Sequence, residues 1–137
     1  MPLCVFAGNK LAMTENELSR IIVDAAFKIH TTLGPGLLES VYETVLAHEL
    51  KLRGLEIKTQ QPIPVIYEQV QLELGFRADI VVGHKVVIEV KSIETLAPVH
   101  AKQLRTYLRL MDMKLGLLVN FNVDLIKNGI HRVVNNL

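Results

Sequence analysis

The sequence has a single cysteine, Cys4, and no tryptophan. One cysteine excludes an intramolecular disulfide and leaves no cysteine set for zinc, so we also expect no iron–sulfur cluster. Neither sign of charge dominates, because fifteen Lys and Arg residues stand against fourteen Asp and Glu. This balance excludes an unpatterned polycation and confines any nucleic-acid site to a local patch. With three Tyr and four Phe, the composition does not suggest a stacking platform for single strands.

Long apolar runs are also missing, and none approaches the ~18–20 residues that cross a membrane. The apolar opening segment lacks the basic start and the full hydrophobic stretch of a signal peptide, so we expect a cytoplasmic protein with no membrane partner. Half of the 137 residues are hydrophobic, which argues against disorder and suits one domain with a real core. We expect residues 1–13 to be a peripheral segment and residues 14–137 to form that single domain.

Periodicity and chain-breaking residues predict a mixture of helices and strands. Thr14 to Glu17 forms a capping-box pattern, which predicts an amphipathic helix that ends near His30. Pro98 suits the first turn of a later helix. The other expected elements are a helix at 37–53, an edge or irregular extended segment at 57–67, and strands at 72–82, 85–91, 114–120 and 130–134. This order predicts a mixed α/β sandwich with helices packed against one sheet.

The residues best suited to chemistry lie within 76–91, FRADIVVGHKVVIEVK. Side chains alternate between the two faces of a strand, so Glu89 and Lys91 share a face, and Asp79 lies on the preceding strand. A strand that looks buried needs a reason to hold a carboxylate and an amine. Converging Asp, Glu and Lys side chains suit metal-assisted phosphodiester hydrolysis, in which carboxylates bind Mg²⁺ and the metal lowers the pKa of a bound water. The lysine would orient or deprotonate that water and stabilise developing charge.

This convergence depends on the turn between the two strands. A strict two-residue turn at Gly83-His84 would place Asp79 opposite Ile88, on the face away from Glu89. A three-residue connection, Gly83-His84-Lys85, or a bulge would restore the shared face. We therefore predict the odd register.

Two motifs resemble those of a known nuclease group. Asp79 followed by Glu89-Val90-Lys91 resembles the D…(D/E)xK signature of the PD-(D/E)XK nuclease superfamily. Residues 36–42, GLLESVY, resemble the motif that names the GxxExxY family, a bacterial and archaeal group placed in that superfamily. The similarity continues through PVHAKQLRTYLRL and KLGLLVNFNV and covers nearly everything from about residue 18 to residue 134. It implies a restriction-endonuclease-like αβββαβ core, with a central mixed sheet flanked by helices, an extra N-terminal helix and a C-terminal strand.

The resemblance also implies roles for individual residues. Asp79 and Glu89 match the metal ligands of the superfamily. Glu39 matches a helix glutamate that can sit beside the metal site, and Lys91 matches the motif lysine. Ala78 stands where the superfamily name puts Pro, which is a frequent variation. The implied cofactor is therefore Mg²⁺ or Mn²⁺.

A later helix carries a second group of candidates. Gln103 and Tyr107 resemble the QxxxY element of RecB-type nucleases, and their spacing puts them on one helical face. There they would position substrate or brace the lysine. Lys102, Arg105 and Arg109 form a basic stripe on the same helix, although many solvated helices carry such a stripe.

The function expected from these residues is that of a metal-dependent nuclease whose partner is nucleic acid, with DNA preferred. A domain of this size covers little duplex, so we also expect a homodimer or a partner protein. Two alternatives stay open: a non-catalytic binding or assembly module of the same fold, and a structural oligomerisation domain. Glu43 is expected to be an ordinary solvent-facing helix residue, and Tyr42 a core aromatic with a satisfied hydroxyl.

Overall fold

The computed structural model describes residues 13–72 and 75–137. Its helices are α2 (Glu15–Leu33), α3 (Glu39–Leu52), α4 (Pro98–Met111) and the short 3₁₀ helix η1 (Ile126–Asn128). Its strands are β1 (Ile57–Pro62), β2 (Val65–Tyr67), β3 (Val70–Leu72), β4 (Arg77–Val82), β5 (Val86–Lys91), β6 (Leu115–Asn120) and β7 (Ile130–Val134). The peripheral segment expected at residues 1–13 lies, apart from Met13, outside the described residues. Among the residues that are described, no helix combines the length and the apolarity needed to cross a membrane.

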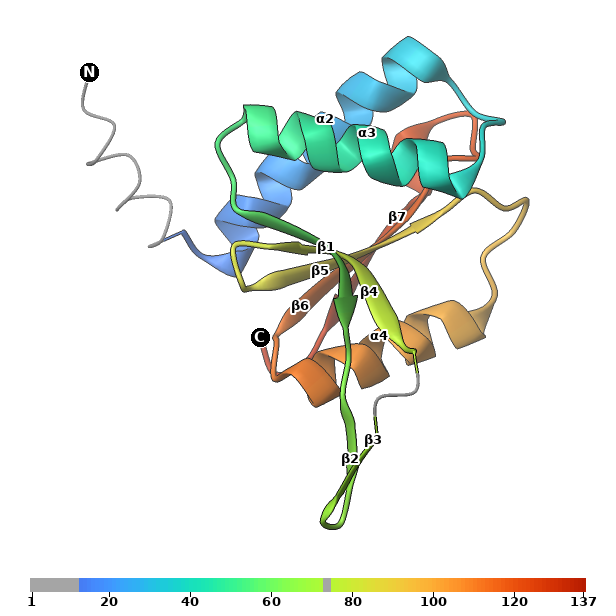
Figure 1. Ribbon diagram of the computed structural model, residues 1–137. Helices are drawn as coiled ribbons and strands as arrows, with labels where there is room; N and C mark the ends of the chain where they lie inside the picture. The colour runs from blue at the N-terminus through green and yellow to red at the C-terminus, as the bar shows by residue number, and fades with distance from the viewer. Residues whose placement is uncertain (1–12, 73–74) are drawn as a thin grey trace, which may run out of the picture.

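Five strands form one mixed sheet between two layers of helices. The strand order is β1-β4-β5-β6-β7, and all neighbours are antiparallel except β5 and β6, which run parallel. A parallel pair needs a crossover connection, which α4 provides. Helices α2 and α3 lie on one side of the sheet and α4 lies on the other (Figure 1). The predicted restriction-endonuclease-like fold is confirmed, including the extra N-terminal helix and the C-terminal strand.

Helix α2 begins with the capping box predicted from the sequence. The Thr14 hydroxyl accepts a hydrogen bond from the Glu17 N–H at 3.2 Å, and the Glu17 carboxylate accepts one from the Thr14 N–H at 3.0 Å. The helix continues to Leu33, one turn beyond the expected end near His30. It stops there because Gly34 takes a φ of 70°, which residues with a side chain rarely adopt.

Helix α3 begins at Glu39, two residues later than expected, because the loop before it is held by Tyr42. The Tyr42 hydroxyl donates to the Gly34 carbonyl at 2.5 Å and accepts from the Leu37 N–H at 3.1 Å. The ring is buried and stacks on Phe121, with 4.5 Å between the ring centroids. Tyr42 is therefore the core aromatic with a satisfied hydroxyl that the sequence predicted.

The region between α3 and β4 departs most from expectation. Both predicted segments, 57–67 and 72–82, are interrupted, and their inner ends form a separate β2–β3 hairpin that projects from the sheet (Figure 1). β1 is the edge strand and pairs with β4. Just beyond the paired residues, the Ile63 N–H donates to the Phe76 carbonyl at 2.8 Å. Pro64 then has no N–H for the ladder, and Gly75 takes a φ of 84°. These two residues separate the hairpin from the sheet.

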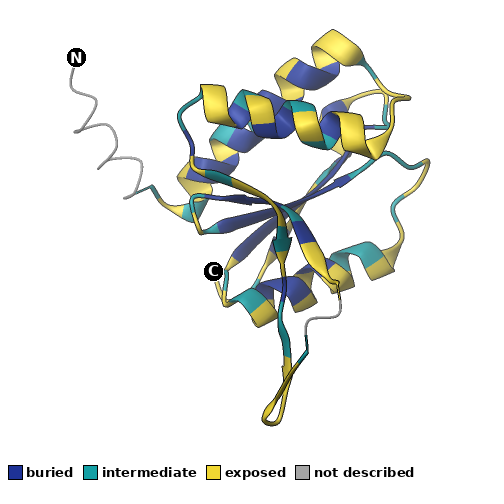
Figure 2. Ribbon diagram, in the orientation of Figure 1, coloured by how far each residue is buried: buried dark blue, intermediate teal, exposed yellow. Residues whose placement is uncertain are grey.

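The sheet packs on both faces, so its central strands are buried along most of their length (Figure 2). One core lies between the sheet and helices α2 and α3, and a second core lies under α4. The alternation of β5 divides its residues between them. Val86, Ile88 and Val90 belong to the first core, and Val87 to the second. Glu89 and Lys91 follow the parity of Val87 and so face the side of the sheet that α4 covers.

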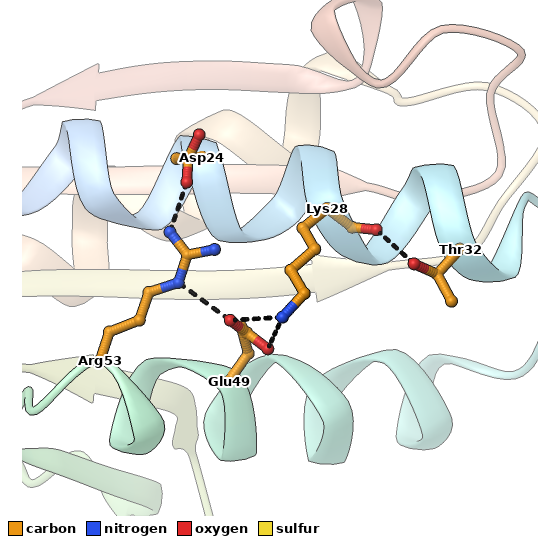
Figure 3. Close-up of polar contacts among 5 residues, drawn as sticks. All are labelled: Asp24, Lys28, Thr32, Glu49 and Arg53. Atoms are coloured by element: carbon orange, nitrogen blue, oxygen red, sulfur yellow. Dashed lines mark hydrogen bonds and ion pairs between the residues drawn. The ribbon is translucent and has the colours of Figure 1, made fainter.

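A network of charged side chains joins α2 to α3 and to Arg53, which follows α3 (Figure 3). Arg53 contacts Asp24 at 2.5 Å and Glu49 at 3.0 Å, while Lys28 reaches the same Glu49 carboxylate at 3.1 Å. The hydrogen bonds from Arg53 and then Lys28 lower the pKa of Glu49. Exposed ion pairs add little stability, and these connect α2 to α3 and its C-terminal end.

Candidate active site

Strands β4 and β5 bring two carboxylates to the same face of the sheet. The ladder pairs Val82 with Val86 across the three-residue connection Gly83-His84-Lys85. The same register, continued along both strands, sets Asp79 opposite Glu89. The predicted odd register is confirmed. Its cause is local, because two consecutive residues of the connection take left-handed backbone conformations.

The Asp79 carboxylate is held at both of its oxygens. Its Oδ2 accepts a hydrogen bond from the backbone N–H of Val90 at 2.8 Å, and its Oδ1 lies 3.4 Å from the Gln60 amide nitrogen. The backbone pairing of β4 and β5 ends at Ile80 and Ile88, and beyond it the Asp79 side chain accepts the hydrogen bond from the β5 backbone. The half-buried carboxylate is thereby oriented mainly by the backbone of the neighbouring strand, with the Gln60 side chain at the longer distance.

Glu89 is the most unusual ionisable residue of the site. Only 7% of it is exposed, in the middle of a buried strand. Burial raises its pKa from 4.5 to about 9, the neighbouring Asp79 adds to the increase, and Lys91 opposes it. A carboxyl group in this state favours either a proton or a cation beside it. Burial and a second carboxylate therefore both oppose the ionisation of Glu89.

Helix α4 closes the site from the other side. Tyr107 is only 8% exposed, and its pKa is raised by burial and then by the charges of Glu89 and Asp79. Tyr107 therefore lies near both carboxylates; its predicted role in positioning substrate or bracing the lysine stays a prediction. Gln103 lies one turn earlier on an exposed part of α4. Lys91 is half-buried, two residues beyond Glu89 and on the same face of β5.

Glu39 occupies the margin of this arrangement. It is exposed at the start of α3, and its carboxylate accepts a hydrogen bond from the backbone N–H of Ser92 at 3.4 Å. Ser92 directly follows Lys91, so Glu39 adjoins the end of β5. Both residues line a surface cavity of about 580 Å³, together with Ser40 and Asn122. Its predicted role as a metal ligand stays a prediction.

The structure corrects our expectation for Glu43 and adds Gln60, which sequence reasoning missed. Glu43 is half-buried rather than solvent-facing, and its carboxylate accepts a hydrogen bond from the Gln60 amide at 2.8 Å. Burial raises the pKa of Glu43, and the charge of Asp79 contributes. Its position one helical turn after Glu39 was a usable signal. Nothing in the sequence marked Gln60, whose φ of 50° aims its amide at both carboxylates.

The donor set fits a divalent cation of the Mg²⁺ type. Within residues 13–72 and 75–137, no three His, Cys, Asp or Glu side chains gather in a way that could hold a metal ion. Asp79 and Glu89 nevertheless form a facing pair of carboxylates, and Mg²⁺ is usually bound by one or two carboxylates with waters and substrate phosphates. The buried Glu89 would ionise more readily beside such a cation.

A family model described as the PD-(D/E)XK nuclease superfamily matches residues 16–133. This span is most of the chain and includes every residue of the site. The chain belongs to this superfamily. Membership indicates a nuclease-type function and nucleic acid as the ligand class, and PD-(D/E)XK nucleases generally use divalent metal ions. No curated protein and no solved structure matches the chain.

Proposed function

We propose that this PD-(D/E)XK protein is a Mg²⁺- or Mn²⁺-dependent nuclease that hydrolyses phosphodiester bonds in DNA, and that it belongs to the GxxExxY group. The observation that carries this proposal is the facing of Asp79 and the buried Glu89 across β4 and β5, with Lys91 on the same face. A structural sheet has no reason to bury a carboxylate next to another one. The facing carboxylates are explained if together they bind a cation.

The residues divide the work as follows. Asp79 and Glu89 bind the metal, and the Val90 N–H keeps the Asp79 carboxylate oriented towards it. The metal, when bound, lowers the pKa of a water and offsets the charge that develops on phosphorus. Lys91 orients that water or takes its proton and stabilises the developing negative charge. Gln103 and Tyr107 contact the substrate from α4, and Glu39 stands at the mouth of the site.

A non-catalytic binding or assembly module of the same fold is the second candidate. The observation that favours it is the wide exposure of the chain's apolar side chains outside the site, including the projecting hairpin residues Ile66, Tyr67 and Val70. Large exposed apolar patches mark interaction surfaces. A homodimer or a partner protein in the cytoplasm is compatible with either function, because so small a domain covers little duplex.

Metal titration followed by DNA cleavage separates the two candidates. Calorimetry with Mg²⁺ and Mn²⁺ is applied to the wild type, Asp79→Asn and Lys91→Ala, and each protein is then incubated with linear, nicked and branched DNA. We expect Asp79→Asn to lose metal binding and cleavage together. Lys91→Ala should keep metal binding and lose cleavage by on the order of 10²–10³-fold, because it removes a group that acts on the transition state.

Matched controls are available among exposed residues to which no role in the site is assigned. Asp124→Asn and Lys127→Ala change exposed residues next to and within η1 and should leave both readouts at wild-type values. Metal binding by the wild type without cleavage of any substrate would support the non-catalytic module. Absence of metal binding at millimolar concentrations would refute the proposed nuclease function.

A further inference from the structure

A cavity of about 350 Å³ lies at the base of the β2–β3 hairpin, where β1 ends and β4 begins. This volume falls within the ~300–1,000 Å³ that is typical of small-molecule sites. Six of its lining residues are Pro62, Ile63, Pro64, Gln71, Phe76 and Arg77. The walls are therefore largely apolar and stiff, with one amide and one guanidinium at the surface.

Phe76 is the side chain that gives this cavity its character. The ring is 45% exposed although its residue type favours burial. It also packs at a tilt against Tyr107, with 6.3 Å between the ring centroids and 56° between the planes. Because Tyr107 is itself buried, Phe76 is held in place while it lines the cavity. A fixed aromatic ring facing an open cavity is a stacking surface for another planar group.

Strand β4 and the Tyr107 side chain both connect the cavity lining to the candidate active site. Arg77 and Asp79 are two residues apart on β4, so they project on the same side, about 7 Å apart along the strand. Tyr107 links the two regions, because it contacts Phe76 on one side and lies near the carboxylates Asp79 and Glu89 on the other. A chain whose phosphate sits at the carboxylates therefore passes its neighbouring nucleotide over Phe76.

Charge favours the same occupant. Arg77 is exposed, and among the described residues its guanidinium Nη1 donates to the Gln60 carbonyl at 3.2 Å. A guanidinium carries five N–H donors, so the others can reach a phosphate oxygen. Among the described residues that line the cavity, none carries an acidic side chain. An apolar wall, an aromatic ring and an arginine together match the base and the phosphate of one nucleotide.

We infer that this cavity receives one unpaired nucleobase beside the phosphate to be cleaved, stacked on Phe76, with Arg77 contacting an adjacent phosphate. The inference rests on the proposed nuclease function and specifies its substrate class. A base inside a duplex is paired and stacked on both faces, so it must leave the helix before it can enter a cavity. The substrate is therefore single-stranded at the cut, as in a free strand, a flap or a frayed end. The low aromatic content argued against a stacking platform, but one ring placed beside the site suffices for one base.

The test compares Phe76→Leu with Phe76→Tyr, which keeps the aromatic ring, and with Phe27→Leu. Phe27 is the matched control because it is 42% exposed and lies on α2, on the opposite side of the sheet. Fluorescence anisotropy in EDTA measures binding to three probes: a short single-stranded DNA, the same strand built wholly from abasic nucleotides, and a blunt duplex of the same sequence. Calorimetry with Mn²⁺ on the same proteins reads the metal site independently.

We expect the wild type to bind the normal single strand more tightly than the abasic strand or the duplex. Phe76→Leu should weaken binding of the normal strand by between about 5-fold and about 150-fold, which corresponds to the loss of one stacked base. Phe76→Tyr and Phe27→Leu should bind it as the wild type does, and all four proteins should bind the abasic strand equally. All four should also bind Mn²⁺ with the same affinity, because Phe76 is outside the metal site.

Equal affinity of the wild type for the normal and abasic strands would overturn the inference, as would wild-type binding by Phe76→Leu or a preference for the duplex. If Mn²⁺ binding is intact in any of these cases, the cavity has been misassigned and the nuclease proposal stands. If the wild type binds no Mn²⁺ at all, the nuclease proposal and the inference that rests on it are both refuted.

Discussion

The buried carboxyl of Glu89 should make the metal-free protein less stable as the pH rises. Its pKa is about 9 in the folded protein and near 4.5 when the chain is unfolded. Between these values the folded state holds a proton that the unfolded state has released. The free energy of unfolding therefore decreases with rising pH, by about 1.4 kcal/mol per pH unit. The stability is complete below about pH 4.5 and is lost progressively up to about pH 9.

Replacing this residue with its neutral isostere, Glu89→Gln, should remove the dependence. At pH 7 the wild type has lost about 3 kcal/mol relative to its value below pH 4.5, and the variant has not. The variant should therefore be more stable than the wild type by that amount at neutral pH, although it lacks a proposed metal ligand. Strain of this kind, tolerated for the sake of function, is common at active sites.

Urea unfolding in EDTA at about pH 5.5, 7 and 8.5 measures the effect. The informative quantity is the difference in free energy of unfolding between the two proteins, because contributions from groups that do not interact with Glu89 cancel in it. This difference should grow with pH by about 1.4 kcal/mol per unit. Glu94→Gln, which removes an exposed carboxylate between β5 and α4, should run parallel to the wild type.

A difference that stays constant with pH would refute the reasoning, because it would mean that Glu89 is ionised in the folded protein. Mn²⁺ provides a second check. Ligand binding to the folded state stabilises it in proportion to the logarithm of the concentration over Kd. Added Mn²⁺ should therefore stabilise the wild type and leave Glu89→Gln unchanged.

Three further predictions concern the framework of the site. Tyr42→Phe removes the hydroxyl that holds the Gly34 carbonyl, and urea unfolding should show a loss of about 1–3 kcal/mol, with wild-type stability contradicting the proposed role. Gln60→Gly should be more stable than Gln60→Ala by roughly 1–2 kcal/mol, because only glycine adopts a φ of 50° without steric cost. Both Gln60 variants should bind Mn²⁺ more weakly than the wild type in calorimetry, since both lose the amide beside the carboxylates. Gly116→Ala would put a Cβ 2.8 Å from Leu104 Cγ, and the resulting shift of α4 should lower the thermal midpoint through a loss of about 1–3 kcal/mol.

The elements that were predicted well are those specified by neighbouring residues. The capping box at Thr14 and the proline at Pro98 both mark helix starts where the structure has them. The odd register of β4 and β5 could be predicted because the expected chemistry required Asp79 and Glu89 to lie on the same face across a short turn. The expected end of the first helix and the start of the second were wrong by two or three residues, since the backbone conformation of Gly34 and the bonds of the Tyr42 hydroxyl to the connecting loop decide them.

The residues that were missed depend on contacts between distant parts of the chain. Gln60 reaches Glu43 from another element and Asp79 from a neighbouring strand, and neither separation has a period that a sequence reveals. The tilted packing of Phe76 against Tyr107 is of the same kind, because it joins the residue before β4 to the second half of α4. The hairpin that interrupts the two predicted segments begins where the chain leaves the sheet at Pro64. The segment contains two prolines, Pro62 and Pro64, and the sequence did not show at which of them the strand would be interrupted.

By itself, the sequence determined the class of fold and most of its elements, and it singled out two carboxylates and a lysine as candidates, because periodicity, turn chemistry and a spaced motif are properties of the chain. Only the tertiary structure decided how deeply Glu89 is buried, that Glu43 turns towards the site, and that an aromatic ring lies open beside it. The physical reason is that burial and electrostatic interaction belong to the packed arrangement. A carboxyl group has an ordinary pKa in the unfolded chain, and it acquires its unusual affinity for a proton or a cation only when the sheet and α4 exclude water from it.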